Sequence, residues 1–552
     1  MKTNSRHIIS CTFAVGIVYR LLMSLQGIDH TDMGFCMTFY QNIFRHPEAM
    51  TFYFNYYLTG FFGGLWQTAF PQLGLLGFRL LETLTMSVAV WLIYLAFRPW
   101  MSSAKISAAA IVLSFLFPSF ILTFHYNTLS FLLMAASIFA MAHWLLEDKG
   151  WWLLAAGVFI GISFFARIVN ITMGALIVVP LLSGWLSKSR RPFTCALVYA
   201  CGIIAGCILV GGLLVATGQL TYFKAGVSEA FGVFGGHETS HTSGNLFWVY
   251  LKSYINIGLQ VFALFLIAVA YGYTTRLSFK VKVGMRAMLL AALFVLTATS
   301  QPYLSAIAGC TLLILPFMFN RLPGRILVYN NDASTEQAML MLYVLLMAYL
   351  FPFGSDIGIP GIFHWCGGLL IIPASCCCAK LTRQWQIHLT GALALSVGLC
   401  MMWKMVVNTN SDDTPRTAAT TVALPHTLNT MTSADKALQY KNIVNRIAQH
   451  AGHCRLLLIA NQASELYYAT SMLPFTGNTQ MGTFTGNILI ERLNQQQQFY
   501  QQLPVIVYLL RGFDTPDVPS MRQTLQPWME EMNYRLNYSD NDLQIYTTST
   551  LP

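Results

Sequence analysis

Apolar segments of about 20 residues recur along most of this chain, and they constrain its fold more than any other feature. A helix of about 20 residues crosses the hydrocarbon core of a bilayer. Only 10% of the 552 residues are charged, against roughly 25% in soluble domains. The pattern therefore predicts an all-α polytopic membrane bundle of about 13 transmembrane helices. The thirteen predicted spans are 8–26, 71–97, 106–124, 128–146, 151–168, 171–187, 193–217, 248–275, 287–300, 304–320, 338–353, 361–379 and 387–407.

The basic residues indicate how these spans are oriented. Before Asn408 there are 23 Lys and Arg residues and 11 Asp and Glu residues. Most of the basic residues fall in every second loop between the predicted spans, and these loops are short. Such loops face the cytoplasm under the positive-inside rule. Thirteen crossings then place the amino terminus inside and the carboxyl terminus outside the inner (cytoplasmic) membrane. The positive charge is a topology signal, so we expect no nucleic-acid partner.

The chain divides at the end of the last apolar segment. Residues 1–407 are the predicted transmembrane domain, 408–431 a linker, and 432–552 an α/β domain on the periplasmic or extracytoplasmic side. Apolar runs predict strands at 455–460 and 504–510, and an edge strand at 542–547. Thr432 and Asp435 form a capping-box pattern for a helix ending near residue 449, and further helices are expected at 486–502 and 517–532. The domain contains no phosphate loop or metal-ligand spacing, which predicts an accessory role.

Two carboxylates follow the first predicted span, in Gly27-Ile-Asp-His-Thr-Asp-Met-Gly-Phe35. Asp29 and Asp32 would lie at the outer membrane surface, where partial desolvation raises the pKa of a carboxyl group and suits it to general-base catalysis. The bland alternative is that they cap or solvate the next helix. The aromatic stretch from Phe35 to Phe44 is suited to lying along the membrane interface.

This arrangement resembles the C-type membrane glycosyltransferases, which include protein O-mannosyltransferases, lipid A aminoarabinose transferases and the oligosaccharyltransferase catalytic subunit. Those enzymes begin inside and carry an acidic motif with an interfacial helix in the first outer loop, and many end in an outer soluble domain. The bacterial motif reads approximately Asp-Glu-x-x-Tyr. Asp32-Met-Gly-Phe35 matches its first Asp and its aromatic residue but has no Glu.

The resemblance implies an inverting transfer of a sugar from a polyprenyl-phosphate-linked donor on the outer face of the inner membrane. The acceptor is a glycan, a lipid or a protein. Asp32 is the implied base, and Asp29 is the second candidate. The leaving phosphate needs cations, and the candidates to bind it are Arg167, Lys224, Arg79 and Lys252.

Each cation also has a structural reading. Arg167 ends a span on the outer side, so it is either a ligand contact or an interface anchor. Arg79 and Glu82 lie three residues apart on one helix, which favours an ion pair within the membrane.

Four further residues are candidates to orient the acceptor. His125 and Asn127 form a tight outer turn, and Asp356 and His364 lie in or near another outer loop. No cofactor is predicted, although His237, Glu238 and His241 have a spacing that suits a divalent metal such as Mg or Mn. These three lie among Gly, Ser and Thr residues, which favours a plain loop.

Two other functions fit a membrane bundle of this kind. A transporter or flippase for lipid-linked saccharides would bind its substrate near the midplane with broken helices and buried charges. Few charges interrupt the spans, chiefly Arg20, Arg79 and Glu82, and the two halves are not alike. A polysaccharide polymerase or ligase relies on a large outer loop with Arg and His residues, to which the segment containing Lys224 and His237 is a poor match.

Overall fold

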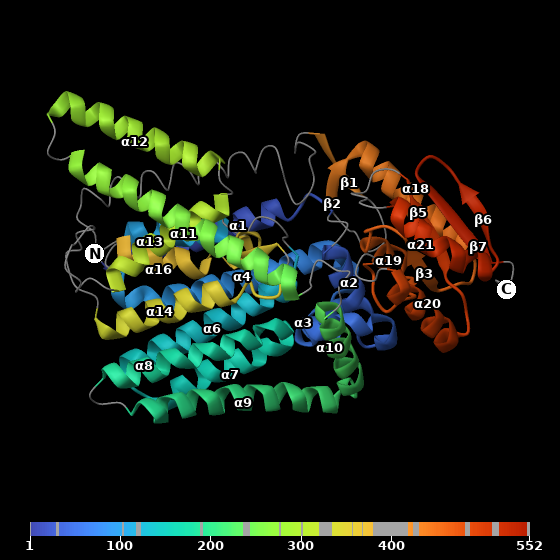
Figure 1. Cartoon of the computed structure of the whole chain (residues 1–552), viewed down its shortest axis with the longest axis horizontal. Coiled ribbons are helices and arrows are strands. Elements are labelled where there is room, and N and C mark those ends of the chain that lie inside the picture. The colour runs from blue at the N-terminus through green and yellow to red at the C-terminus, as the bar shows by residue number, and fades with distance from the viewer. Residues whose placement is uncertain are drawn as a thin grey trace.

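Long helices run nearly parallel to the long axis of the molecule, and a smaller domain with a sheet lies at one end of them (Figure 1). The computed structural model describes residues 2–28, 32–101, 104–116, 123–187, 191–235, 243–274, 278–299, 302–318, 334–355, 357–366, 368–378, 418–422, 430–480, 486–510 and 518–548. The bundle helices are α1 (Lys2–Met23), α4 (Gly74–Phe97), α5 (Ala104–Leu116), α6 (Tyr126–Glu147), α7 (Gly150–Ala166), α8 (Val178–Leu186), α9 (Pro192–Ala216), α11 (Ser243–Tyr273), α12 (Phe279–Thr299), α13 (Pro302–Met318), α14 (Thr335–Leu350), α15 (Gly358–Cys366) and α16 (Gly368–Cys378).

The described helices confirm a multi-pass membrane bundle. Six helical stretches in the described part are long and apolar enough to cross a membrane: Arg6–Met23, Pro71–Trp100, Tyr126–Glu147, Ile168–Leu186, Pro192–Ala216 and Gly244–Tyr271. Shorter apolar helices lie among them. Every predicted span up to residue 379 overlaps a helix, whereas the last one, 387–407, lies outside the described residues. The count of thirteen crossings stays a prediction.

Helices α7 and α9 approach one another closely through glycines spaced four residues apart. A Cβ added to Gly157 or Gly161 of α7 would lie 2.2 Å from the carbonyl oxygen of Tyr199 or 2.1 Å from that of Ile203. A Cβ on Gly202 would lie 2.2 Å from the carbonyl oxygen of Leu154. Small residues at this spacing let helix backbones touch inside a membrane, where dispersion contacts replace the hydrophobic effect.

The buried ion pair of the bundle differs from the predicted one. Glu82 of α4 pairs with Arg20 of α1, and both side chains are buried. Arg79 instead donates to the carbonyl oxygens of Ser24 at 2.6 Å and Gly27 at 2.5 Å. The expected pairing of Arg79 with Glu82 was wrong because the guanidinium of Arg79 satisfies the backbone that leaves α1, whose last carbonyls have no partner within the helix.

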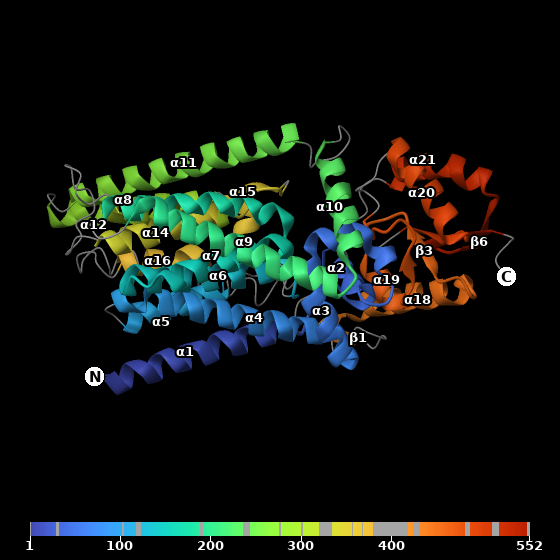
Figure 2. The same ribbon diagram turned by 90° about the horizontal axis from the view of Figure 1, so that it is seen from below.

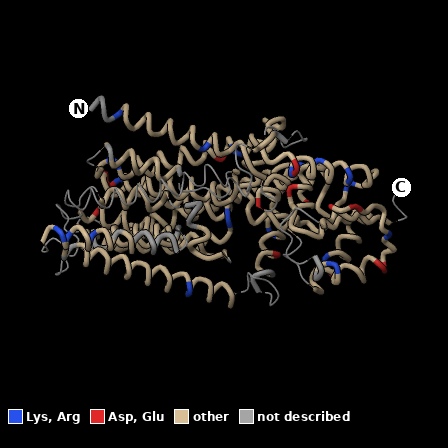
Figure 3. Tube along the Cα trace, turned by 90° about the horizontal axis from the view of Figure 1, so that it is seen from above, with Lys and Arg blue, Asp and Glu red and all other residues tan. Residues whose placement is uncertain are grey.

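Short helices from two outer loops form a layer between the bundle and the C-terminal domain (Figure 2). The first loop supplies α2 (Asp32–Asn42), η1 (Pro47–Tyr56) and α3 (Tyr57–Ala69), and the second supplies α10 (Leu220–Gly235). Three short 3-10 segments, η2 (Pro71–Leu73), η3 (Arg98–Trp100) and η4 (Ile168–Ile177), adjoin bundle helices. Along the described chain, Asp and Glu gather mainly in this layer and in the C-terminal domain, and the middle of the bundle has few charges (Figure 3).

The C-terminal domain has a five-stranded mixed sheet in the order β4-β3-β5-β7-β6. Strands β3 and β5 are parallel, and β5, β7 and β6 are antiparallel. The strands are β3 (Leu456–Ile459), β4 (Leu473–Pro474), β5 (Val505–Leu509), β6 (Tyr534–Ser539) and β7 (Leu543–Thr548), and the helices are α18 (Ala434–Ala451), α19 (Glu465–Thr470), α20 (Gly486–Tyr500) and α21 (Val518–Glu531).

Most elements predicted for this domain are present, with two corrections. The predicted edge strand at 542–547 is β7, which lies inside the sheet, and the edge strand is β6. Helix α18 is capped by Ser433, whose hydroxyl accepts the Lys436 amide at 3.2 Å, rather than by Thr432.

Part of the segment predicted to be a linker is a hairpin. Strand β1 (Ala419–Val422) pairs antiparallel with β2 (Thr430–Ser433). The backbone of Met431 accepts from the Gly27 amide and donates to the carbonyl of Leu25, each at 2.9 Å. The entrance of the C-terminal domain is therefore fastened to the chain that leaves α1.

Candidate active site

Asp32 is the first residue of α2, close to the C-terminal domain. Its side chain is partly exposed, and its Oδ1 lies 3.5 Å from the amide nitrogen Nε2 of Gln480, which donates to it. A carboxylate at a helix N-terminus is stabilised by the helix dipole. The rest of α2 is almost fully buried, so it is enclosed by protein; its predicted place along the membrane interface stays a prediction.

A stack of aromatic rings adjoins Asp32 and joins three elements. Phe35 of α2 stacks on Tyr53 with ring centroids 4.7 Å apart, and Tyr56 stacks on Tyr126 at 4.3 Å. Phe35 also lies 6.2 Å from Tyr126. The stack connects the first outer loop to the first turn of α6.

Arg167 lies beside the Tyr126 ring of this stack. Its guanidinium carbon is 5.9 Å from the centre of the Tyr126 ring, a distance typical of a cation–π contact. The same group donates to the carbonyl oxygens of Phe351 at 2.8 Å and Phe353 at 3.1 Å. Only 4% of Arg167 is exposed, so its charge acts in a medium that screens it weakly. Arg167 thus holds the end of α14 and places a cation beside Tyr126.

Tyr56 lies within reach of the charges of both Asp32 and Arg167. Burial raises the pKa of the Tyr56 hydroxyl to about 12; the Arg167 cation opposes this rise and the Asp32 carboxylate adds to it. Asp32 and Arg167 are therefore both within electrostatic reach of Tyr56, as expected if the two residues face one site.

His125 and Asn127 belong to the same region. His125 caps α6, since its Nδ1 accepts the Thr128 amide at 3.2 Å. Burial lowers the pKa of the His125 imidazole to about 3, and the Arg167 cation acts in the same direction. The ring is therefore neutral at physiological pH, which excludes it as a cation for phosphate. Asn127 is fully buried one turn before Ser130.

The remaining predicted residues are exposed, are bonded to backbone carbonyls, or fall outside the described part of the chain. Lys224 on α10 and Lys252 on α11 are exposed, and Arg79 is occupied by the backbone after α1. The positions outside the described residues are Asp29, Asp356, the side chain of His364, and the three residues of the predicted metal site, His237, Glu238 and His241. Within the described residues no group of three or more His, Cys, Asp or Glu side chains is placed to hold a metal ion.

The C-terminal domain contacts α2 directly, and no sequence pattern predicted this contact. Backbone atoms of Ser464 and Glu465 pack so tightly on Gly34 that a Cβ there would lie 2.1 Å from the Glu465 nitrogen. The Tyr53 hydroxyl donates to Asn478 Oδ1 at 2.5 Å and accepts the Thr479 amide at 3.1 Å. The same segment of the C-terminal domain contains Gln480, the residue that contacts Asp32.

A second polar contact fastens the domain to the other outer loop. Arg492 of α20 lies 3.0 Å from Glu229 of α10 and donates to Thr51 of η1 at 3.0 Å. Burial raises the pKa of the Glu229 carboxyl, whereas the Arg492 cation acts to lower it. The contact joins the domain to both outer loops at once.

The hydrogen bonds of the Tyr53 hydroxyl to the C-terminal domain lead to a prediction for the variant Tyr53→Phe. The change leaves the buried Thr479 amide without its acceptor, and an unsatisfied buried group costs about 1–3 kcal/mol. We expect hydrogen exchange of the segment around residues 474–480 to become about 5–150-fold faster. Tyr538→Phe, which removes a hydroxyl bonded to Asp540 at 2.8 Å near the surface, is the matched control. Equal exchange in wild type and Tyr53→Phe would show that this contact does not hold the domain.

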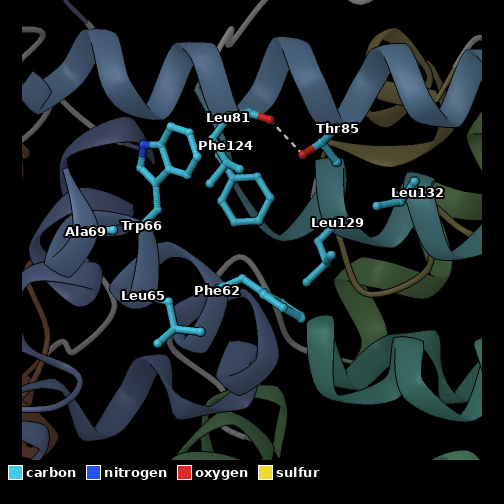
Figure 4. Close-up of a pocket in the computed structure, with 9 residues that line it drawn as sticks. All are labelled: Phe62, Leu65, Trp66, Ala69, Leu81, Thr85, Phe124, Leu129 and Leu132. Carbon is cyan, nitrogen blue, oxygen red and sulfur yellow. Dashed lines mark hydrogen bonds between the residues drawn. The ribbon is translucent and has the colours of Figure 1, made fainter.

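An apolar cavity of about 380 Å³ opens beside the turn that contains His125. Figure 4 shows its walls, which come from α3, α4, α6 and the residue before His125. The Tyr40 hydroxyl of α2 donates to the Phe124 carbonyl at 2.8 Å, which connects the cavity wall to the acidic helix. The lining residues are Phe62, Leu65, Trp66, Ala69, Leu81, Thr85, Phe124, Leu129 and Leu132.

The membrane part of the chain is similar to a known family. The family profile described as dolichyl-phosphate-mannose-protein mannosyltransferase matches residues 66–210. This segment runs from the end of α3 into α9 and contains His125, Asn127 and Arg167, whereas Asp32 and the C-terminal domain lie outside it. A comparison with curated proteins finds no match to the chain.

The match confirms the resemblance to the C-type membrane glycosyltransferases. Together with the apolar helices, it shows that the matched part of the chain is similar to multi-pass membrane glycosyltransferases. More particularly, the chain is similar to the O-mannosyltransferase branch of that class, whose members use lipid-linked donors.

Proposed function

We propose that the protein is an inverting glycosyltransferase that moves a sugar from a polyprenyl-phosphate donor to an acceptor on the outer face of the inner membrane. The observation that carries the proposal is the placement of a carboxylate, Asp32, and a buried cation, Arg167, around one tyrosine pair. A base and a cation are the two groups that displacement of a sugar from a lipid phosphate requires. The partial match to mannosyltransferases supports the same reaction.

The reaction proceeds in one displacement. The acceptor oxygen or nitrogen forms a bond to the anomeric carbon, and its proton passes to the Asp32 carboxylate. The bond from the anomeric carbon to the phosphate oxygen breaks, and its electron pair leaves with the lipid phosphate. Arg167 stabilises the negative charge on that phosphate from a poorly screened position. Attack opposite the leaving group inverts the anomeric configuration.

The apolar cavity accounts for the lipid part of the donor. Its walls are almost entirely hydrocarbon and aromatic, and it adjoins the turn containing His125 and Tyr126. Burial of isoprene units there is favourable by about 25 cal/mol per Å² of apolar surface. The chain would thus hold the sugar phosphate next to the aromatic stack, with Asp32 and Arg167 on either side.

The sidedness follows from the charge pattern. Asp32 lies in the first long loop and contacts the C-terminal domain, and the basic residues of the short loops predict the cytoplasm at the opposite end of the bundle. The protein then acts in the cell envelope with its C-terminal domain periplasmic, where a glycan, lipid or protein acceptor can reach Asp32.

The stereochemistry of the product tests the proposal. Purified protein in nanodiscs is supplied with a panel of polyprenyl-phosphate sugars of defined anomeric configuration and with envelope acceptors. We expect release of polyprenyl phosphate together with a product of the opposite configuration, measured by NMR. Retention of configuration would exclude the single displacement. Passage of the intact lipid-linked sugar across vesicle membranes without transfer would favour a flippase instead.

A further inference from the structure

Two buried asparagines near the candidate active site have amide atoms without hydrogen-bond partners. Asn127 is 0% exposed, and neither its Oδ1 nor its Nδ2 is bonded within the described structure. Asn170 is 1% exposed, and its Oδ1 is likewise unbonded there. Leaving a buried polar atom unsatisfied costs about 1–3 kcal/mol, and folded proteins rarely do so without a ligand or water. Three such atoms therefore indicate an absent partner.

Asn170 contacts α6 at Ser130, three residues after Asn127. The Nδ2 of Asn170 donates to the hydroxyl of Ser130 at 2.9 Å and to the carbonyl of Ser163 at 3.0 Å. Ser130 follows Asn127 by three residues, so the two lie on neighbouring turns of one helix side. The bonded Nδ2 fixes the Asn170 amide and leaves its Oδ1 as an acceptor.

The same contacts connect this pair to the reacting groups. The backbone N–H of Asn170 donates to the backbone carbonyl of Arg167 at 2.9 Å. The Arg167 guanidinium lies over the ring of Tyr126, the neighbour of Asn127. The unbonded atoms comprise two acceptors and one amide donor group. None carries a charge, so the ligand that fits them is neutral and both donates and accepts hydrogen bonds. Hydroxyl groups have that property.

We infer that Asn127 and Asn170 form a subsite that binds hydroxyl groups of a saccharide, in support of the glycosyl transfer proposed above. Adjacent sugar hydroxyls can donate to the two Oδ1 atoms and accept from Asn127 Nδ2. This binding positions the sugar ring beside Arg167 and the aromatic stack. The saccharide is either the sugar of the donor or that of a glycan acceptor, since both present the same chemistry.

Asn127→Leu tests the subsite because it changes stability and binding in opposite directions. Leu has a similar branched shape and removes two unsatisfied polar atoms, so the thermal midpoint of the ligand-free protein should stay the same or rise. Binding of the saccharide that occupies the subsite, measured with polyprenyl-phosphate mannose and with the acceptor glycan, should weaken about tenfold, since a hydrogen-bonded interaction is lost. Asn487→Leu, at an exposed position on α20, is the matched control and should change neither quantity.

Three binding measurements separate the sources of the saccharide. If the donor sugar occupies the subsite, Asn127→Leu weakens binding of polyprenyl-phosphate mannose but not of polyprenyl phosphate alone. If a glycan acceptor occupies it, donor binding is unchanged and the KM for the acceptor glycan rises. An ordered water as the only partner would make Asn127→Leu less stable with both binding constants unchanged, and would overturn the inference. The inference would also be overturned if the wild-type protein transfers sugar and Asn127→Leu binds donor and acceptor as tightly as the wild type does. That result would leave the proposed function intact.

Discussion

Replacing Asp32 with Asn is expected to lower the rate of sugar transfer by ~10²–10⁴-fold, the share that general-base catalysis supplies. Asn keeps the size of the side chain and an Oδ1 that can still accept from Gln480, so the contact to the C-terminal domain is retained. The oxygen that takes the acceptor's proton is lost. The measurement is the turnover of a labelled polyprenyl-phosphate sugar by purified protein, with binding of the donor followed separately.

The structure provides the control for this change. Asp435→Asn alters an exposed carboxylate in the first turn of α18, which lies outside the candidate site, and should leave turnover unchanged. Asp29→Asn should have the smaller effect if Asp29 only orients its neighbours, and the larger one if it is the base. Normal turnover in both Asp29→Asn and Asp32→Asn would make the acidic motif structural and remove the main residue-level argument for an enzyme.

Removing the cation of Arg167 is the second large effect. We expect Arg167→Leu to lower the transfer rate by about 10²–10³-fold, as does loss of one group that stabilises developing negative charge. The leaving phosphate would then face a neutral site. Arg167→Lys keeps the charge but cannot reproduce the fork that holds Phe351 and Phe353, so it should retain more activity than Leu.

The affinity of the Arg167 variants for polyprenyl phosphate distinguishes a role of Arg167 in binding phosphate from a role in holding the end of α14. If the charge matters, product binding weakens in Arg167→Leu and is kept largely intact in Arg167→Lys. If the two carbonyl contacts of Arg167 are what matter, Lys and Leu lose activity and thermal stability equally, and the phosphate role is wrong. Lys252→Leu on the exposed face of α11 should leave both readouts unchanged.

The elements of the fold were predictable because their signals are local. Apolar runs of about 20 residues mark helices wherever they occur, and the buried runs at 456–459 and 505–509 form the central parallel strands. Strand β6 was not predicted, although Tyr534, Leu536 and Tyr538 alternate with polar residues, because the segment is short and, as the structure shows, largely exposed. Without β6, the alternating strand β7 was taken for the edge.

The candidate site was only partly predictable, because its contacts join distant segments. Asp32 and Arg167 were identified individually from their positions at the ends of spans. Gln480, however, lies 448 residues from Asp32 in sequence, and no short pattern reveals such a pairing. The spacing of Arg79 and Glu82 predicted a local ion pair, whereas the backbone after α1 binds Arg79 and a different helix supplies Arg20.

The docking of the C-terminal domain at two places has a consequence for biosynthesis. The backbone of Met431 bonds the entrance of the domain to Gly27, and Gln480 contacts Asp32. Although Asp32 is among the first residues to leave the ribosome, its surroundings wait for a segment made 448 residues later. At 5–20 residues per second this delay is about 20–90 s. The contacts around Asp32 are therefore complete only after the C-terminal domain has been synthesised and has folded.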